Sequence, residues 1–314
     1  MNPCAAAFLH ACELDVLALK PGNVSVDSPG HGMSAEDFRA SAQVAAPILC
    51  DAGLTVGERV YWAMEATWDT VACNTNLGIL LLAAPLIHAA QRRLPDESFL
   101  RRLQRTLAGL GREDADWVYR AIRLANPAGL GRSERHDVAQ PPAVTLLAAM
   151  HEAASRDRIA RQYTNVYSDV FEIGLPRLRE GRARWNGEEQ AVTTAFMGFL
   201  AAFPDSHVLR KYGAASSEAV LIQAAACQAE LDRCADWAAA RPHLEQLDDA
   251  FKAARINPGT SADLTVATCL AERLLMADFD SQRVPVGGSA PERDLWLAEP
   301  TFFVSTQGGC HGKD

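Results

Sequence analysis

Apolar residues recur at helical spacing along most of the chain, and no segment alternates apolar and polar residues with the period of two expected for a strand. Ala5–Leu19 shows the helical pattern first and ends at Pro21-Gly22. Ser34-Ala-Glu-Asp37 has the form of a capping box, so a helix is predicted to follow it to about Cys50. The other segments predicted as helices are 56–73, 77–90 with a kink at Pro85, a pair within 98–125 broken near Gly109–Gly111, 143–155, 157–175, 188–203, 216–240, 242–255 and 261–277.

This pattern predicts an all-α fold in which residues 1–279 form a single multi-helix globular domain. Residues 280–314 are rich in Pro and Gly and are predicted to be an irregular C-terminal tail. Trp296, Phe302 and Phe303 in this tail are interpreted as docking residues against the body or against another subunit, which leaves room for a homo-oligomer.

Composition narrows the class of protein further. A formal net charge of -9 argues against broad nucleic-acid binding, although a small anionic ligand needs only a local cationic patch. The longest apolar run, Ile79–Ile87, is far shorter than the roughly 20 residues that span a bilayer, so no membrane span is predicted. The eight cysteines are scattered, without a C-x-x-C pair, and the N-terminus lacks the features of a secretory signal. We therefore expect a cytoplasmic protein.

Three polar segments interrupt the apolar helices: Lys20–Asn23, Asn74–Gly78 and Asn257–Asp263. Each joins a Gly, which lets backbone approach a ligand closely, to amide, hydroxyl, carboxylate or ammonium groups. Lys20 is a candidate point charge for a phosphate, although the residues alone favour a solvated Lys at a helix C-terminus.

The second and third polar segments each precede a predicted helix. Thr75 or Asn76 is the expected N-cap of the helix that follows, yet the segment holds more polar groups than one cap needs, and a helix start can bind an anion. In the third segment, Thr260 or Ser261 can cap the next helix, and Asp263 can favour its dipole or instead contact a ribose or a metal.

Further candidates lie outside these three segments. Glu65 and Asp69 are four residues apart on one predicted helix face. Two interpretations are open: the carboxylates form a solvent-exposed stripe, or they bind Mg²⁺. His136 and Asp137 lie in the long loop 126–142, where a general base and an ordinary polar surface are both open interpretations. The turn Asp205–Gly213 offers Arg210 and Lys211 for phosphate, and Asp205 for a metal or a cap.

Taken together and in this order, the three polar segments resemble those of the triphosphoribosyl-dephospho-coenzyme A synthase family, over a region from about Ala11 to about Leu275. The resemblance implies an all-α transferase in which the 2′-hydroxyl of dephospho-coenzyme A attacks ribose C1′ of ATP and expels adenine. Mg²⁺ is expected with the triphosphate.

The residues assigned on this basis fall into three roles. The catalytic candidates are His136, Asp137 and Glu65. The candidates for binding substrate and phosphate are Lys20, Gly22, Asn74, Thr75, Asn76, Gly78, Arg210, Lys211, Asn257, Gly259, Thr260 and Ser261. The metal candidates are Glu65, Asp69, Asp205 and Asp263.

The chain departs from the family pattern at two places. Asn76-Leu77 stands where many synthases carry His-Lys, and only His31-Gly-Met33 remains of a longer signature after Lys-Pro-Gly. In this it resembles a divergent branch associated with one-carbon carrier coenzymes. The missing cation predicts a poor synthase. A related transferase or condensing enzyme that acts on a methanopterin- or methanofuran-type coenzyme precursor is therefore one alternative, and a non-catalytic helical ligand-binding or scaffold protein is another.

Overall fold

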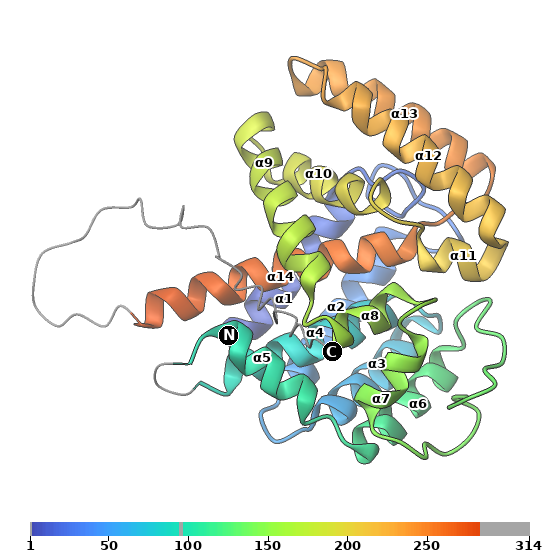
Figure 1. The fold of residues 1–314 in the computed structure, drawn as a ribbon. Helices are drawn as coiled ribbons and strands as arrows, with labels where there is room; N and C mark the ends of the chain where they lie inside the picture. The colour runs from blue at the N-terminus through green and yellow to red at the C-terminus, as the bar shows by residue number, and fades with distance from the viewer. Residues whose placement is uncertain (1, 94–96, 283–314) are drawn as a thin grey trace, which may run out of the picture.

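The computed structural model describes residues 2–93 and 97–282 of the 314-residue chain. Fourteen α-helices and one short π-helix make up this part, and no strand occurs within it (Figure 1). The predicted all-α fold is therefore confirmed. Residues 283–314, with the aromatic residues predicted to dock, lie outside the described residues, and whether 1–279 is one domain stays a prediction.

Most helices follow one another with short connections, and the two long ones are residues 18–34 and the segment that contains loop 126–142. Their bounds are α1 (Pro3–Leu17), α2 (Ala35–Leu49), α3 (Val56–Val71), α4 (Leu77–Gln91), α5 (Phe99–Ala108), α6 (Arg112–Ala125), α7 (Leu146–Ala153), α8 (Arg158–Thr164), the π-helix Val170–Gly174, α9 (Leu175–Trp185), α10 (Glu188–Leu200), α11 (Ser206–Tyr212), α12 (Ala214–Leu231), α13 (Trp237–Ala253) and α14 (Gly259–Gln282).

Helices α4 and α14 form the centre of the molecule and contact each other (Figure 1). Nearly every side chain of α4 is buried, as its apolar sequence predicts. The helix runs unbroken through Pro85, which has no N–H to donate to the carbonyl of Leu81. The hydroxyl of Tyr163 donates to that carbonyl at 2.6 Å, so a side chain from outside the helix supplies the missing hydrogen bond.

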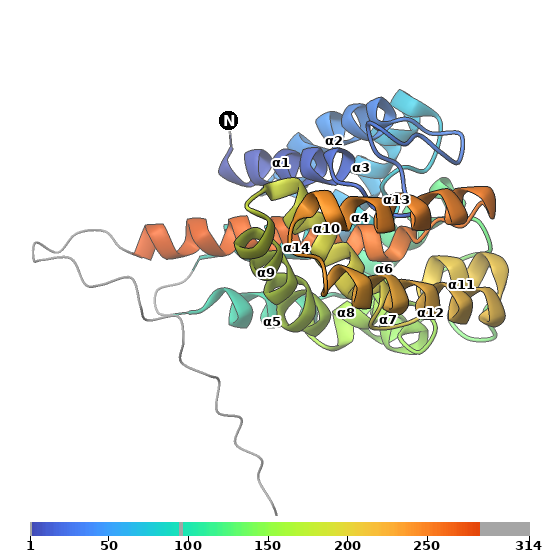
Figure 2. The same cartoon turned by 90° about the horizontal axis from the view of Figure 1, so that it is seen from above.

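Two hydrophobic clusters share helix α10. Val192, Ala195 and Phe199 face the larger cluster, which α1–α8 and α14 also build. Phe196 and Met197 face the smaller cluster beneath the α12–α13 hairpin, which lies on the other side of α14 from α2–α8 (Figures 1 and 2). Because opposite faces of one helix enter both clusters, the two parts pack around a common element.

Several predicted elements are confirmed and others are wrong. The capping box at Ser34 and the break between α5 and α6 are confirmed. The helix predicted over 157–175 ends at Thr164, because Val166 and Tyr167 adopt left-handed backbone that brings the Tyr167 hydroxyl 2.9 Å from the carbonyl of Leu82.

The predictions after residue 200 contain two errors. The predicted turn at 205–213 contains helix α11, which Asp205 caps. The break between the two following helices lies at residues 232–236 rather than near 241, so Pro242 falls inside α13. No helix in the described part of the chain has both the length and the apolar character needed to cross a membrane.

Candidate active site

The three polar segments meet at one cavity of about 630 Å³. Its lining includes Asn23 from the first segment, Asn74, Thr75 and Gly78 from the second, and Asn257, Gly259, Thr260 and Asp263 from the third. The second and third segments include the first turns of α4 and α14, so two long helices begin at this cavity. Loop 126–142, α8 and α11 complete the walls.

Lys20 lies behind the cavity wall, with only 1% of the residue exposed. Its ammonium group contacts Asp15 Oδ1 at 2.8 Å, Asn23 Oδ1 at 2.9 Å and the carbonyl of Val24 at 3.3 Å. Burial raises the pKa of Asp15, which lines the cavity, and the charge of Lys20 opposes that rise. These contacts engage all three N–H groups of Lys20 in the protein, so a direct bond to phosphate stays a prediction.

The first and third segments are bonded to each other. Asn23 Nδ2 donates to Asn257 Oδ1 at 2.8 Å. Gly22 has a φ of 81°, and a Cβ at this position would lie 2.9 Å from the carbonyl oxygen of Ile256. A side chain there would separate the two segments, so Gly22 is required for packing as well as for its backbone conformation.

The second segment caps α4 in a way that differs from the prediction. Asn76 occupies the N-cap position, as predicted, but its side chain makes no cap hydrogen bond, and Asn74 Oδ1 instead accepts from Leu77 N at 3.1 Å. The hydroxyl groups of Thr75 and Ser41 form a hydrogen bond, with 2.6 Å between their oxygens. Asn76 is outside the lining and donates from Nδ2 to Thr67 Oγ1, whereas Leu77 is part of the wall.

Asp205 lies behind the third segment and fixes its position. Its carboxylate accepts from Ser261 N and Ser261 Oγ at 2.8 Å each, and from the backbone N–H groups of His207 and Val208. Burial raises the pKa of Asp205, and these hydrogen bonds oppose that rise. Neither Asp205 nor Ser261 lines the cavity, so both hold the segment in place from behind.

Asp263 is a half-buried carboxyl in the lining, with no hydrogen bond or ion pair to any of the described residues. Its carboxyl group lies directly against Gly78, which has no side chain to obstruct it. Burial raises the pKa of Asp263 well above its ordinary value, and the nearby carboxylates of Asp15, Asp205 and Asp157 add to this rise. Asp263 is thus a carboxyl available to a ligand.

Helix α11, which lies against the third segment, brings cations to the cavity. Arg210 and Lys211 both line the cavity, as the phosphate prediction requires. Arg210 Nη1 lies 3.3 Å from Asp157 Oδ2, and Arg210 Nε donates to the carbonyl of Ala128. His207 lies beside them, and burial together with these two positive charges lowers its pKa to about 4.

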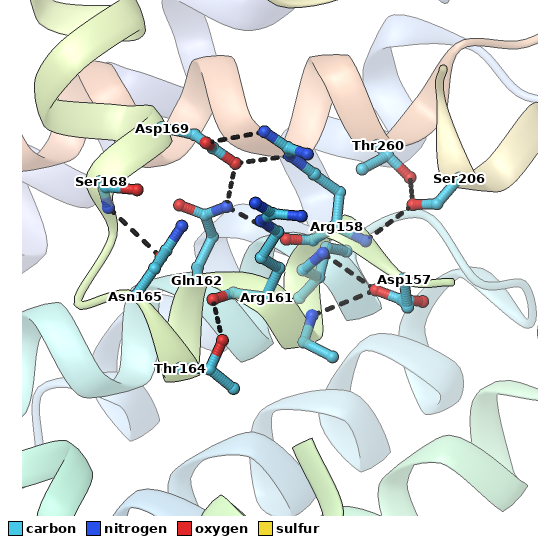
Figure 3. A network of polar contacts seen from close by, with 12 residues as sticks. Asp157, Arg158, Arg161, Gln162, Thr164, Asn165, Ser168, Asp169, Ser206 and Thr260 are labelled. Atoms are coloured by element: carbon cyan, nitrogen blue, oxygen red, sulfur yellow. Dashed lines mark hydrogen bonds and ion pairs between the residues drawn. The ribbon is translucent and has the colours of Figure 1, made fainter. Parts of the chain in front are cut away.

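A polar network fixes α8 against α11 and α14 (Figure 3). Arg158 binds Asp169 through two hydrogen bonds of 2.6 and 2.9 Å. Its backbone N–H donates to Ser206 Oγ, which lies 3.0 Å from Thr260 Oγ1. This network connects Asp157 and Thr260, which come from separate helices and line the same cavity.

Loop 126–142 places His136 and Asp137 in the lining. The Tyr119 hydroxyl donates to the His136 carbonyl at 2.9 Å. Hydrogen bonds from Ala139 N and Ser133 N, each 2.8 Å long, lower the pKa of Asp137. Both predicted residues thus reach the cavity, with Asp137 committed to holding the loop.

Glu65 and Asp69 lie on α3 and are not part of the lining. Glu65 Oε1 accepts from the hydroxyl of Tyr61 at 2.9 Å, and Asp69 is exposed. Of the four predicted metal residues, only Asp263 lines the cavity. Residues 2–93 and 97–282 contain no group of three or more His, Cys, Asp or Glu side chains arranged to hold a metal ion.

Sequence reasoning missed several residues of the lining: Asp15, His31, Arg132, Arg135, Arg156, Asp157 and His207. Asp15 could have been identified from the sequence, because a carboxylate inside an apolar helix is rarely buried without a partner. The others lie in polar stretches of ordinary composition, and only the folded chain brings them together.

These features define an all-α protein with a cavity that charged and polar residues line among apolar ones. Exposed cations, among them Lys211 and Arg132, surround the mouth, and buried or half-buried carboxylates lie inside. The model of the CitG family, described as ATP:dephospho-CoA triphosphoribosyl transferase, matches residues 1–280. The chain belongs to this family.

Individual relatives agree with this assignment. A Klebsiella pneumoniae protein named 2-(5''-triphosphoribosyl)-3'-dephosphocoenzyme-A synthase is 33% identical over 109 residues, and a Pseudomonas fluorescens protein named as a probable synthase of the same kind is 31% identical over 114. These matches cover 34% and 36% of this chain and 38% of each relative.

A solved structure is also similar. The crystal structure of a proposed triphosphoribosyl-dephospho-CoA synthase from Archaeoglobus fulgidus has a TM-score of 0.56 and 25% identity to this chain. The similarity covers 76% of this chain and 98% of that one.

Proposed function

We propose that this protein is a transferase that moves a triphosphoribosyl group from ATP to dephospho-CoA. The observation that carries the proposal is the convergence of the three polar segments on one cavity, in a chain that belongs to the CitG family. Segments more than 50 residues apart in sequence supply amide, hydroxyl and carboxyl groups to the same space. If the polar segments were only helix caps, as in a non-catalytic scaffold, they would have no reason to meet at one cavity. Their convergence therefore argues against the scaffold alternative.

The triphosphate of the donor has two kinds of partner in the cavity. The first turns of α4 and α14 lie at the cavity, and helix N-termini favour anions. Arg210 and Lys211 offer positive charge from α11. Leu77 adds no charge where the family pattern often has Lys, so we expect turnover to be slow.

The carboxyl groups suit Mg²⁺ that enters with the triphosphate. Mg²⁺ in such sites is held by one or two carboxylates together with substrate phosphates, rather than by a protein cage. Asp263, which has no partner among the described residues, fits this role, and no larger ligand group is needed. The ion would neutralise phosphate charge.

The reaction also needs a group that takes the proton of the attacking hydroxyl. The acceptor oxygen forms a bond to C1′ of the donor ribose, the bond from C1′ to adenine breaks, and the hydroxyl proton passes to a base. His136 is the candidate base, because it belongs to the cavity lining and carries an imidazole. Glu65 lies outside the cavity, and its catalytic role has no support from geometry.

The test is adenine release from Mg-ATP, measured by chromatography with and without dephospho-CoA. We expect release that depends on dephospho-CoA, slower than that of a family member with His-Lys in the second segment. His136→Asn should reduce kcat and leave ATP binding intact. Failure to bind Mg-ATP in titration calorimetry would support the scaffold alternative.

Leu77 in the cavity wall also favours a second candidate, a related transferase or condensing enzyme for a one-carbon carrier coenzyme. Saturable binding of a phosphorylated ligand without adenine release would support that function. Mass spectrometry of compounds that co-purify with the protein would then identify the ligand. The cytoplasmic location, the absence of a nucleic-acid partner and the homo-oligomer stay predictions.

A further inference from the structure

Three arginines line the cavity without a role in the reaction described above. Arg132 and Arg135 belong to loop 126–142, and Arg156 follows α7. All three are exposed, so they lie at the mouth of the cavity. We call Arg132, Arg135 and Arg156 the arginine wall.

Two members of the arginine wall, Arg135 and Arg156, are held in place by their neighbours. Arg156 Nη2 donates to Ser133 Oγ at 3.0 Å, and Arg135 Nη2 lies 3.1 Å from Glu152 Oε2. Asp137 closes the backbone turn between them by accepting from Ser133 N. Guanidinium groups held this way lose little side-chain entropy when they bind a second anion.

The loop itself is attached to the body at several points. Side chains of α6 donate to three of its carbonyls, from Arg112 to Pro142, from Tyr119 to His136 and from Arg123 to Val138. At its other end Gly129 has a φ of 73°, and a Cβ there would lie 2.5 Å from the carbonyl oxygen of Arg210. The loop therefore packs directly on α11.

The volume of the cavity limits what it can enclose. About 630 Å³ is the size of a site that buries one drug-sized ligand. The proposed reaction requires two nucleotides whose ribose groups meet. One of the two must therefore extend through the mouth, past the arginine wall.

The acceptor is the substrate whose shape fits this exit. Dephospho-CoA carries a pyrophosphate between its reacting ribose and a long uncharged pantetheine arm, so its free end can remain outside. Leu130, which lines the cavity and is 40% exposed, lies in the same loop as Arg132. A cation beside an exposed apolar side chain matches a pyrophosphate followed by an uncharged arm.

We infer that the arginine wall is the binding site for the pyrophosphate of the acceptor coenzyme, separate from the donor triphosphate near Arg210 and Lys211. This inference rests on the proposed function, since it assigns one of its two substrates. The wall determines which acceptor is bound and takes no part in proton transfer.

The experiment compares Michaelis constants of the triple variant Arg132→Ala, Arg135→Ala, Arg156→Ala with those of the wild-type protein. We expect KM for dephospho-CoA to rise roughly tenfold or more, the effect of losing charge-assisted contacts. KM for ATP and kcat at saturating acceptor should change less than about twofold, since removal of a ground-state contact leaves the chemical step intact. Thermal denaturation checks that the variant is folded.

The matched control is Arg233→Ala with Arg241→Ala, which removes exposed, ion-paired arginines outside the cavity. This double variant should leave both Michaelis constants unchanged. A rise in KM for ATP in the triple variant would assign the wall to the donor, and no change in either constant would show that the arginines are only solvated. Either result overturns the inference.

A binding measurement separates this inference from the proposed function. Titration calorimetry of the wild-type protein and the triple variant uses dephospho-CoA and, as a probe without pyrophosphate, adenosine. The triple variant should bind dephospho-CoA at least about tenfold more weakly and adenosine equally well. A wild-type protein that binds dephospho-CoA in this charge-dependent way but releases no adenine would refute the proposed reaction alone. A wild-type protein that does not bind dephospho-CoA would refute the inference.

Discussion

Asp15 and Asp263 line the same cavity but have different partners. Asp15 is almost fully buried and forms an ion pair with Lys20, whereas Asp263 has no partner among the described residues. A buried carboxylate without a cation is costly, so Lys20 compensates Asp15, and a ligand is left to compensate Asp263. The pair and the lone carboxyl therefore have separate roles, one structural and one open to chemistry.

Replacing Lys20 by Met should destabilise the protein by about 3–5 kcal/mol, because Asp15 is then left charged and unpaired in the interior. Thermal and urea denaturation measure this loss. Adding Asp15→Asn to Lys20→Met should recover part of it, since the uncompensated charge is removed. An unchanged melting temperature for Lys20→Met would show that the ammonium is not needed for the fold.

At the scale of the element, helix beginnings build the site. Helices α4, α8, α11 and α14 each contribute lining residues from their first turn or their cap. The starts of α4 and α14 come so close that the carboxyl of Asp263 lies against Gly78. This contact needs the absence of a side chain, which explains a Gly in the first turn of a buried apolar helix.

Gly78→Ala should therefore destabilise the protein by about 1–3 kcal/mol, although Gly→Ala in a helix commonly stabilises. The new Cβ would meet the Asp263 carboxyl and lie 2.8 Å from Ile159 Cδ1, so Mg-ATP binding should weaken as well. Denaturation and titration calorimetry give the two readouts. Gly109→Ala is the control, because the nearest atom to its new Cβ would be 3.4 Å away. Its free energy of unfolding should stay within about 1 kcal/mol of the wild-type value. Equal stability of both variants would contradict this account.

The helix content and most helix positions followed from apolar periodicity and from local signals such as Ser34 and Gly109–Gly111. The errors fall where tertiary contacts override local pattern. Tyr163 and Tyr167 bond carbonyls of α4, and this requires the backbone to leave the helix after Thr164. No local pattern near residue 164 reports on a carbonyl more than 80 residues earlier in the sequence.

At the scale of the whole molecule, the three polar segments could be identified from the sequence, because Gly, Pro and Asn interrupt an apolar pattern. Their separate roles could not. Whether Lys20 faces a ligand or Asp15 depends on how α1 packs, and Asp157 and His207 reach the cavity only through the contacts of α8 and α11. Glu65 and Asp69 share a helix face as predicted, but that face is turned away from the cavity lining.

His88, at the end of α4 and bonded to Thr106 of α5, makes the stability of the whole chain depend on pH. Burial, together with the charges of Arg59 and Arg92, lowers its pKa to about 4. The unfolded chain binds a proton below about pH 6.5 that the folded chain does not bind until about pH 4. The contribution of neutral His88 is therefore complete above pH 6.5 and declines as the pH falls toward 4.

We expect the stability difference between the wild-type protein and His88→Gln to be constant above pH 6.5. Below that pH it should change by about 1 kcal/mol per pH unit in favour of the variant. Urea denaturation at a series of pH values measures it. His151→Gln, at an exposed position of α7, is the control variant measured in parallel. A flat difference for His88→Gln would mean that its imidazole is protonated as easily in the fold as in the unfolded chain.

The bonds from α6 to loop 126–142 all end on backbone carbonyls, at His136, Val138 and Pro142. These hydrogen bonds depend on the backbone path of the loop and do not depend on which side chains stand at those three positions. At the half-buried positions His136 and Val138 the side chain can therefore be replaced without loss of the anchoring hydrogen bond, while α6 keeps the loop at the cavity. The wall of the cavity that this loop forms can thus change in chemistry while its backbone stays in place.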